Sequence, residues 1–295
     1  MLEAVTGFSQ AIQLDPEFAT AYADRSLVLN GLSRNYSAGA KRRNYVEEAQ
    51  ADAKKAIVLQ PDLAVGHLAL AGIYENGTLD FPGAKSEYAR ALVLSAGDAK
   101  VLRRYGQFEV LMGHSDPGLD ALRRSVTLDP LNGRNYFLLG EGYVWSHRPK
   151  EALVAFDEAK ALEPDDASVY GWIGYAYLTA HDYQSAKEAC ERTIEDNRFH
   201  CLAMAYDGLG RHGDAEAMLA KLTSSPMTTE NQGIGVFLAM IYAQRGDVDR
   251  ALAELERALG ERDPYLEYLK TNPFLDPLRR KPRFQAIERE LNFPE

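Results

Sequence analysis

Few residues of this 295-residue chain have a type and spacing suited to acid–base or metal chemistry. His114, His147, His181 and His212 each lie at a predicted turn between two helices, which indicates solvated turns rather than a metal cluster. Glu141 and nearby acids could form a catalytic carboxylate pair, but a solvated helix face explains them better. The sequence contains no GxxxxGK[ST], HExxH or CxxC motif and no GxGxxG after a strand. We therefore expect no catalytic residue, no cofactor and no metal, and the chain is not predicted to be an enzyme.

Peptide recognition is the chemistry that the sequence supports best. Basic and aromatic side chains recur on the predicted inward face of three successive helices, and such a mixture suits a peptide with an acidic and an apolar part. The alternative is that Trp145 and Trp172 fill gaps between helix pairs while the basic residues are solvated. The candidate groove residues are Lys100, Arg103, Arg104, Gln107, Arg134, Phe137, Glu141, Trp145, Trp172, Tyr175 and Thr179.

Composition excludes several other classes of protein. A net charge of −10 argues against a nucleic-acid partner, because such proteins neutralise phosphates with Lys and Arg. No apolar run approaches the roughly 20 residues of a membrane helix, and the N-terminus lacks the pattern of a secretory signal. The two cysteines, Cys190 and Cys201, are too few for a disulfide framework and predict a reducing compartment with two small buried hydrophobic side chains. We expect a cytoplasmic protein.

The elements that must position the groove residues follow from an internal repeat. Segments starting at Ala99, Gly133 and Ala167 align with each other at a spacing of 34 residues. In each unit the first predicted helix carries a glycine, such as Gly140 or Gly174, whose cost in helix propensity of roughly 1 kcal/mol requires close helix packing to offset it. Small and aromatic residues form one stripe of the second helix, and a proline ends it. The repeat predicts an all-α solenoid of helix pairs.

The repeat extends with less regularity over nearly the whole chain. About eleven extra residues in Asn30–Tyr45 predict either a longer loop between helices or extended helices, and basic residues there, including Arg34 and Arg42, suggest a solubilising or a docking loop. The leading segment looks like the second helix of a pair whose first helix is missing, so we expect a fragment of a longer protein. The predicted units are 1–18 (incomplete leading repeat), seven helix pairs in 19–264 (19–63 with the insertion, 64–98, 99–132, 133–166, 167–195, 196–231 and 232–264) and 265–295 (C-terminal cap).

The matched residues, such as Tyr136, Leu139, Gly140 and Tyr143 followed by Ala152, Phe156 and Ala159, resemble the tetratricopeptide repeat. The resemblance implies a right-handed solenoid of about seven helix pairs with a leading half-repeat and a C-terminal capping helix. Segments 79–94, 202–222 and 246–294 look similar to repeat regions of bacterial signalling proteins, which follow a class III nucleotidyl cyclase, a winged-helix or a kinase domain. That finer resemblance implies a regulatory or interaction role.

Three functions remain open from the sequence. The first is a non-catalytic scaffold that binds a peptide or a partner domain in its concave groove. The second is an autoregulatory segment whose ligand is its own upstream effector domain. The third is a homo-oligomerisation module that pairs through the exposed half-repeat at its N-terminus.

Overall fold

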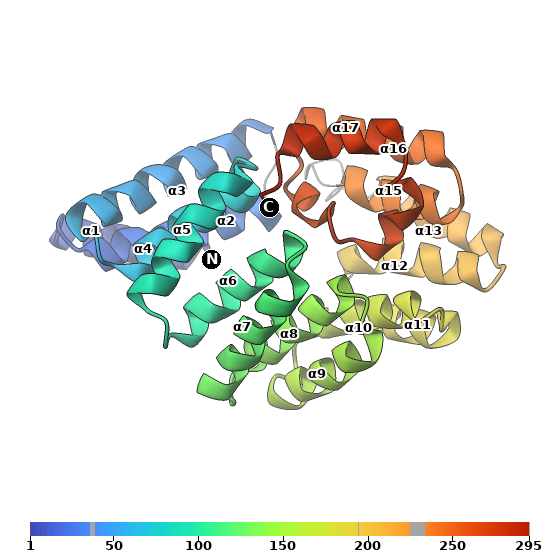
Figure 1. Ribbon diagram of the computed structural model, residues 1–295, viewed down its shortest axis with the longest axis horizontal. Coiled ribbons are helices and arrows are strands. Elements are labelled where there is room, and N and C mark those ends of the chain that lie inside the picture. The colour runs from blue at the N-terminus through green and yellow to red at the C-terminus, as the bar shows by residue number, and fades with distance from the viewer. Residues whose placement is uncertain (36–38, 194, 225–233, 295) are drawn as a thin grey trace.

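The computed structural model describes residues 1–35, 39–193, 195–224 and 234–294 as an array of antiparallel helix pairs (Figure 1). The described part contains no β-strand, which confirms the predicted all-α class. The elements in chain order are α1 (Leu2–Leu14), α2 (Ala19–Asn35), α3 (Gly39–Leu59), α4 (Ala64–Gly72), η1 (Ile73–Gly77), α5 (Phe81–Leu94), α6 (Ala99–Leu111), α7 (Ser115–Leu128), α8 (Gly133–Trp145), α9 (Pro149–Leu162), α10 (Ser168–Thr179), α11 (Tyr183–Cys190), α12 (Glu195–Gly208), α13 (His212–Ser224), α15 (Ile234–Gln244), α16 (Val248–Glu261), η2 (Pro264–Tyr268), η3 (Pro273–Leu278) and α17 (Pro282–Leu291).

Each first helix packs on the helix that follows it and on the first helix of the next pair. Thus α6 packs on α7 and on α8, and α8 packs on α9 and on α10. Caps and prolines set the boundaries: the side chain of Asn132 caps α8, and Pro149 opens α9, where its missing N–H costs nothing. This stacking buries a large apolar core from α4 to the C-terminal segment and a smaller one between the first pair and α4.

The predicted close approach at the repeat glycines is confirmed. A Cβ atom on Gly140 would lie 2.5 Å from Cε1 of Phe156, the aromatic residue of the facing helix α9. A Cβ on Gly174 would lie 2.6 Å from Sγ of Cys190 and 2.7 Å from Sγ of Cys201. Both distances are below those that real Cβ atoms show, so the packing between the helices requires glycine at these two positions.

The extra residues of the first pair lengthen its helices. Helix α2 has 17 residues and α3 has 21, whereas α8 has 13, so the structure favours extended helices over a long loop. Residues 36–38 of the insertion lie outside the described residues. Arg42 is buried and donates to the carbonyl oxygens of Arg262 (2.9 Å) and Asn76 (2.9 Å), so the docking-loop interpretation is wrong for this residue.

Figure 1 shows the array curving until its C-terminal segment lies beside the N-terminal helices. Arg262 donates to the carbonyl of Thr78 at 2.7 Å, and the rings of Phe81 and Phe293 stack with their centroids 4.7 Å apart. The segment after α16 carries fully buried side chains, including Leu266, Leu269 and Leu275. It therefore packs as part of the core and joins the two ends of the array.

The two cysteines are buried as predicted, but they form a disulfide between α11 and α12. The prediction of two free thiols is therefore wrong, because the close packing of these helices over Gly174 brings both sulfur atoms together. Disulfides persist mainly in oxidising compartments, so cysteine usage gives no support to the predicted cytoplasmic location.

Replacing Gly140 with Ala should lower the free energy of unfolding by about 1–2 kcal/mol, because the clash with Phe156 outweighs the gain in helix propensity. Gly260→Ala is the matched control, since nothing lies within 4 Å of a Cβ built on that helical glycine. Chemical denaturation of both variants checks the prediction. A Gly140→Ala protein at least as stable as Gly260→Ala would contradict the close-approach account.

Loss of the disulfide should also destabilise the protein. The bond closes a loop with a sequence separation of 11, for which loop-closure entropy gives about 3 kcal/mol. Mutation of Cys190 removes the bond, so we expect this variant to melt at a lower temperature than the oxidised protein. An unchanged melting temperature is expected only if the bond is absent in solution. Thermal melts with and without a thiol reductant, together with the intact mass, measure this. An unchanged melt on full reduction would show that the bond contributes no stability.

Candidate functional site

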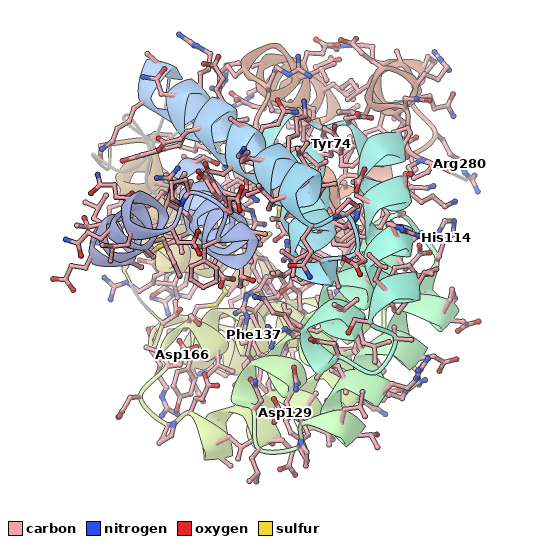
Figure 2. All side chains as sticks on the ribbon, turned by 90° about the vertical axis from the view of Figure 1, so that its left-hand side faces the viewer. Tyr74, His114, Asp129, Phe137, Asp166 and Arg280 are labelled. Carbon is pink, nitrogen blue, oxygen red and sulfur yellow. A yellow bond between two sulfur atoms is a disulfide. The ribbon has the colours of Figure 1, made fainter. Side chains whose placement is uncertain are left out.

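The concave side of the array holds a pocket of about 220 Å³ between the middle pairs and the C-terminal segment. Residues from α2, α6, α8, α10, α12, α15 and η2 line it, so almost the whole chain contributes to its wall. Phe137, on the pocket wall, lies further inside the array in Figure 2 than Asp129 at the end of α7.

The repeat explains why the predicted residues meet here. Gln107, Glu141 and Tyr175 occupy equivalent positions of successive first helices, 34 residues apart, so stacking of the helices places them in one row. The predicted groove residues that line the pocket are Arg104, Gln107, Arg134, Phe137, Glu141, Trp145, Trp172 and Tyr175.

The remaining predicted residues lie outside the pocket lining. Lys100 is exposed at the start of α6, with its amine 3.9 Å from a carboxylate oxygen of Asp24. Arg103 donates at 3.0 Å to Oδ1 of Asn135, and Thr179 donates at 2.8 Å to the carbonyl of Ala176. Arg103 therefore borders the site, while the hydroxyl of Thr179 forms a hydrogen bond within the last turn of α10.

A buried polar network forms one wall of the pocket. Arg104 donates to Oε1 of Gln107 at 2.9 Å and lies 3.4 Å from Oε2 of Glu75. Gln107 in turn donates to Oε1 of Glu141 at 3.2 Å. The oxygens of Tyr88 and Glu75 raise the pKa of Arg104 against the opposing effect of burial, so this arginine remains a firmly held cation.

A second ionic contact joins the first pair to the C-terminal segment. Arg34 at the end of α2 forms an ion pair with Glu267 and donates to the hydroxyl oxygen of Tyr268 at 2.6 Å. Glu267 is almost fully buried, and burial raises its pKa to about 7 although Arg34 opposes that shift. Burial also raises the pKa of Glu141, although Arg134 and Arg34 oppose that shift.

The arginines at the mouth repel one another. Burial, together with the charges of Arg134 and Arg104, lowers the pKa of Arg103 to about 10. The guanidinium of Arg134 lies over the ring of Phe137, 4.5 Å from its centroid. In the described part of the chain its side chain forms no hydrogen bond or ion pair. An anion at this mouth would relieve the repulsion between these cations.

Aromatic side chains form the rest of the pocket, and the C-terminal segment supplies several of them. Tyr268 stacks on Trp145 with centroids 5.0 Å apart, and Phe274 lies 5.4 Å from Tyr175. Trp145 and Tyr175 are buried, whereas Trp172 is half-buried and meets Trp145 edge to face at 5.4 Å. The aromatic part of the predicted groove is therefore largely filled by the chain itself.

Sequence reasoning missed part of the lining. His200 and Phe237 occupy inward positions on α12 and α15, which are the first helices of later pairs. The spacing of 34 residues is interrupted before both helices, so these positions could not be assigned from the sequence. Arg34 and the C-terminal residues Tyr265, Tyr268 and Asn272 lie far from the groove helices in sequence and belong to no repeat position, so periodicity gives no signal for them.

Three of the four histidines predicted at turns lie there, whereas His212 is the first residue of α13. His147 and His181 have positive φ values of 57° and 59°, and His114 directly precedes α7. Within the described ranges no three His, Cys, Asp or Glu side chains gather in a way that would hold a metal ion. Among the described helices, none combines the length and the apolar character that a bilayer crossing requires.

No protein-family model matches the chain. The chain is similar to tetratricopeptide repeat protein 21B of Mus musculus, with 27% identity over 137 residues that cover 42% of this chain and 10% of that protein. It is also similar to the type IV pilus assembly protein PilF of Pseudomonas aeruginosa, with 27% identity over 133 residues, 44% of this chain and 52% of PilF. The chain thus spans only part of either relative.

Solved structures share the fold. The APC/C hetero-tetramer Cut9–Hcn1 matches with a TM-score of 0.63 and 14% identity, over 99% of this chain and 52% of that one. PilW, a type IV pilus biogenesis factor, matches with a TM-score of 0.55 and 15% identity, over 69% of this chain and 96% of that one. The predicted resemblance to cyclase, winged-helix and kinase proteins is not supported by these matches and stays a prediction.

The buried Glu267 should make stability depend on pH. Its folded pKa of about 7 lies above its ordinary value of 4.5, so its contribution is fully present below about pH 4.5 and is lost as the pH rises through 7. Glu267→Gln should therefore be more stable relative to the unsubstituted protein at pH 8.5 than at pH 5.5. Urea denaturation at both values tests this, and a difference that is independent of pH would refute the burial account.

Proposed function

Because this chain is a tetratricopeptide-repeat protein, we propose that it is a non-catalytic scaffold that binds a peptide segment of a partner protein on its concave side. The assembly roles in the names of PilF and PilW support a scaffold role for proteins of this fold. The binding surface proposed here is the mouth of the pocket, formed by Lys100, Arg103, Arg134 and Trp172, and is called the rim below.

The observation that carries the proposal is the state of Arg134. It is exposed, it lies over Phe137, and its side chain forms no ion pair within the described residues. Arg103 beside it is partly buried, and its Nε atom has no hydrogen-bond partner in the described structure. In a protein with a net charge of −10, a local cluster of incompletely paired arginines is suited to a carboxylate from outside the chain.

The position of the C-terminal segment limits how a peptide can lie. Tyr268 and Phe274 cover Trp145 and Tyr175, so a peptide does not reach the aromatic floor beneath them. The N-terminal halves of α6, α8 and α10 remain accessible through the rim residues. We therefore assign the acidic part of the peptide to Arg103 and Arg134 and the apolar part to Trp172. The charges would act mainly on the association rate, and the aromatic anchor would supply most of the affinity.

A displayed random peptide library tests the proposal without a known partner. Selection on the unsubstituted protein should enrich peptides that carry Asp or Glu near an apolar or aromatic residue. A selected peptide should bind Arg134→Glu at least about tenfold more weakly, because reversal of a rim charge repels an acidic ligand. Arg90→Glu on α5 is the matched control, since Arg90 is exposed on a second helix, and it should change the affinity little.

Trp172→Phe provides the second variant, since the smaller ring keeps the aromatic packing with Trp145 and Phe137. This variant should bind the selected peptide more weakly, while its melting temperature stays within a few degrees of that of the unsubstituted protein. Enrichment of basic peptides, no enrichment, or equal effects of Arg134→Glu and Arg90→Glu would overturn the assignment of the rim.

A further inference from the structure

Residues that line the pocket carry several unpaired polar atoms. Of the thirteen buried side-chain atoms without a hydrogen-bond partner among the described residues, five belong to residues that line this pocket. They are Nε of Arg34, the hydroxyl of Tyr175, both ring nitrogens of His200 and Nδ2 of Asn272. A buried polar atom without a partner costs about 1–3 kcal/mol, so such a cluster is expected where a ligand supplies the partner.

These groups mainly donate hydrogen bonds. The Nε of Arg34 and the Nδ2 of Asn272 can only donate, and the hydroxyl of Tyr175 can do so. Burial lowers the pKa of His200 to about 3, so its neutral ring offers one donor and one acceptor. The excess of donors calls for a ligand group rich in acceptors, such as a carboxylate.

The charges of the residues that line the pocket favour an anionic ligand. Arg34, Arg104 and Arg134 line the pocket together with a single carboxylate, that of Glu141. Arg34 and Arg104 have carboxylate partners in Glu267 and Glu75, whereas the side chain of Arg134 has none in the described part of the chain. A bound anion would balance this remaining positive charge.

The walls specify the body of the ligand. Phe137, Trp172, Phe237 and Tyr265 contribute aromatic surface, and the ring of His200 stacks between Phe237 and Tyr175 at 4.3 and 5.5 Å. The volume of about 220 Å³ is many times the roughly 10–15 Å³ that a cavity needs to hold one water. It accommodates a ring with a short side chain.

We propose that this pocket binds a small aromatic carboxylate of the arylacetate class. Its ring lies among the aromatic side chains of the wall, and its carboxylate accepts hydrogen bonds from the unpaired donors named above. This site goes beyond the proposed peptide surface, because it adds residues that the rim does not contain and shares only Arg134 and Trp172 with it. The added polar residues are Arg34, Tyr175, His200 and Asn272. A ligand there touches the first pair, the middle pairs and the C-terminal segment at once, and so it stabilises the closed array by mass action.

Calorimetric titration of the full chain with 4-hydroxyphenylacetate tests the site. Its neutral amide and hexanoate serve as controls, because the amide lacks the charge and hexanoate lacks the ring. We expect a dissociation constant below about 1 mM for the aromatic acid, at least tenfold weaker binding of both controls, and a melting temperature that rises with the concentration of the acid.

Two variants remove the polar atoms and keep the shape. His200→Phe retains the stacking on Phe237, and Tyr175→Phe deletes only the hydroxyl. Neither breaks a hydrogen bond within the described residues, so both free proteins should be at least as stable as the original. Each should bind 4-hydroxyphenylacetate at least about fivefold more weakly.

Three results would overturn the inference: no binding of the aromatic acid up to 10 mM, equal binding of the acid and its amide, or full affinity in both variants. None of them decides the peptide selection, whose variants change Arg134 and Trp172, whereas the variants of the small-ligand site change His200 and Tyr175. Conversely, a failed peptide selection with intact binding of the aromatic acid would remove only the proposed scaffold function.

Discussion

The buried contact of Arg34 with Glu267 and Tyr268 is the constraint on which the site depends. The two contacts span sequence separations of 233 and 234 positions. In a repeat array, by contrast, each repeat otherwise contacts mainly the adjacent repeats. Together with the donation of Arg42 to the carbonyl of Arg262, it joins the C-terminal segment to the first helix pair and closes the concave side into a pocket. Burial of the charges is costly, and the hydroxyl of Tyr268 together with the ionic contact offsets only part of that cost, since the pKa of Glu267 stays raised.

Closure changes what the concave side can bind. In an open array of this kind an extended ligand can run across several first helices. Here Tyr268 and Phe274 cover the aromatic side chains of Trp145 and Tyr175. Two surfaces remain: the rim with its incompletely paired arginines, and the pocket, whose lining carries unpaired donors. The two surfaces differ in size and chemistry, and for that reason they are assigned to two different ligands.

Local periodicity made much of this architecture predictable. Gln107, Glu141 and Tyr175 were expected on one face because the spacing of 34 residues repeats without interruption from Ala99, and the structure places them in one row. The close approach at Gly140 was predictable because a glycine inside a helix needs a packing reason. The contacts that closed the pocket were not predictable, because Arg34 and the segment from Pro264 to Leu278 follow no repeat. The disulfide was missed for a related reason, since two cysteines 11 positions apart pair only when α11 and α12 pack closely.

Native-state hydrogen exchange of the segment from Pro264 to Leu278 tests the closed array most directly. The amides of Leu266, Leu269 and Leu275 donate to backbone carbonyls at 3.1 Å, and their side chains are fully buried. Closure predicts that these amides exchange with a protection similar to that of α8, at the centre of the array. An independent terminal element would instead open with a free energy near zero, like a fraying end. Exchange of these amides as fast as those of α1, which has no buried residue, would contradict the account.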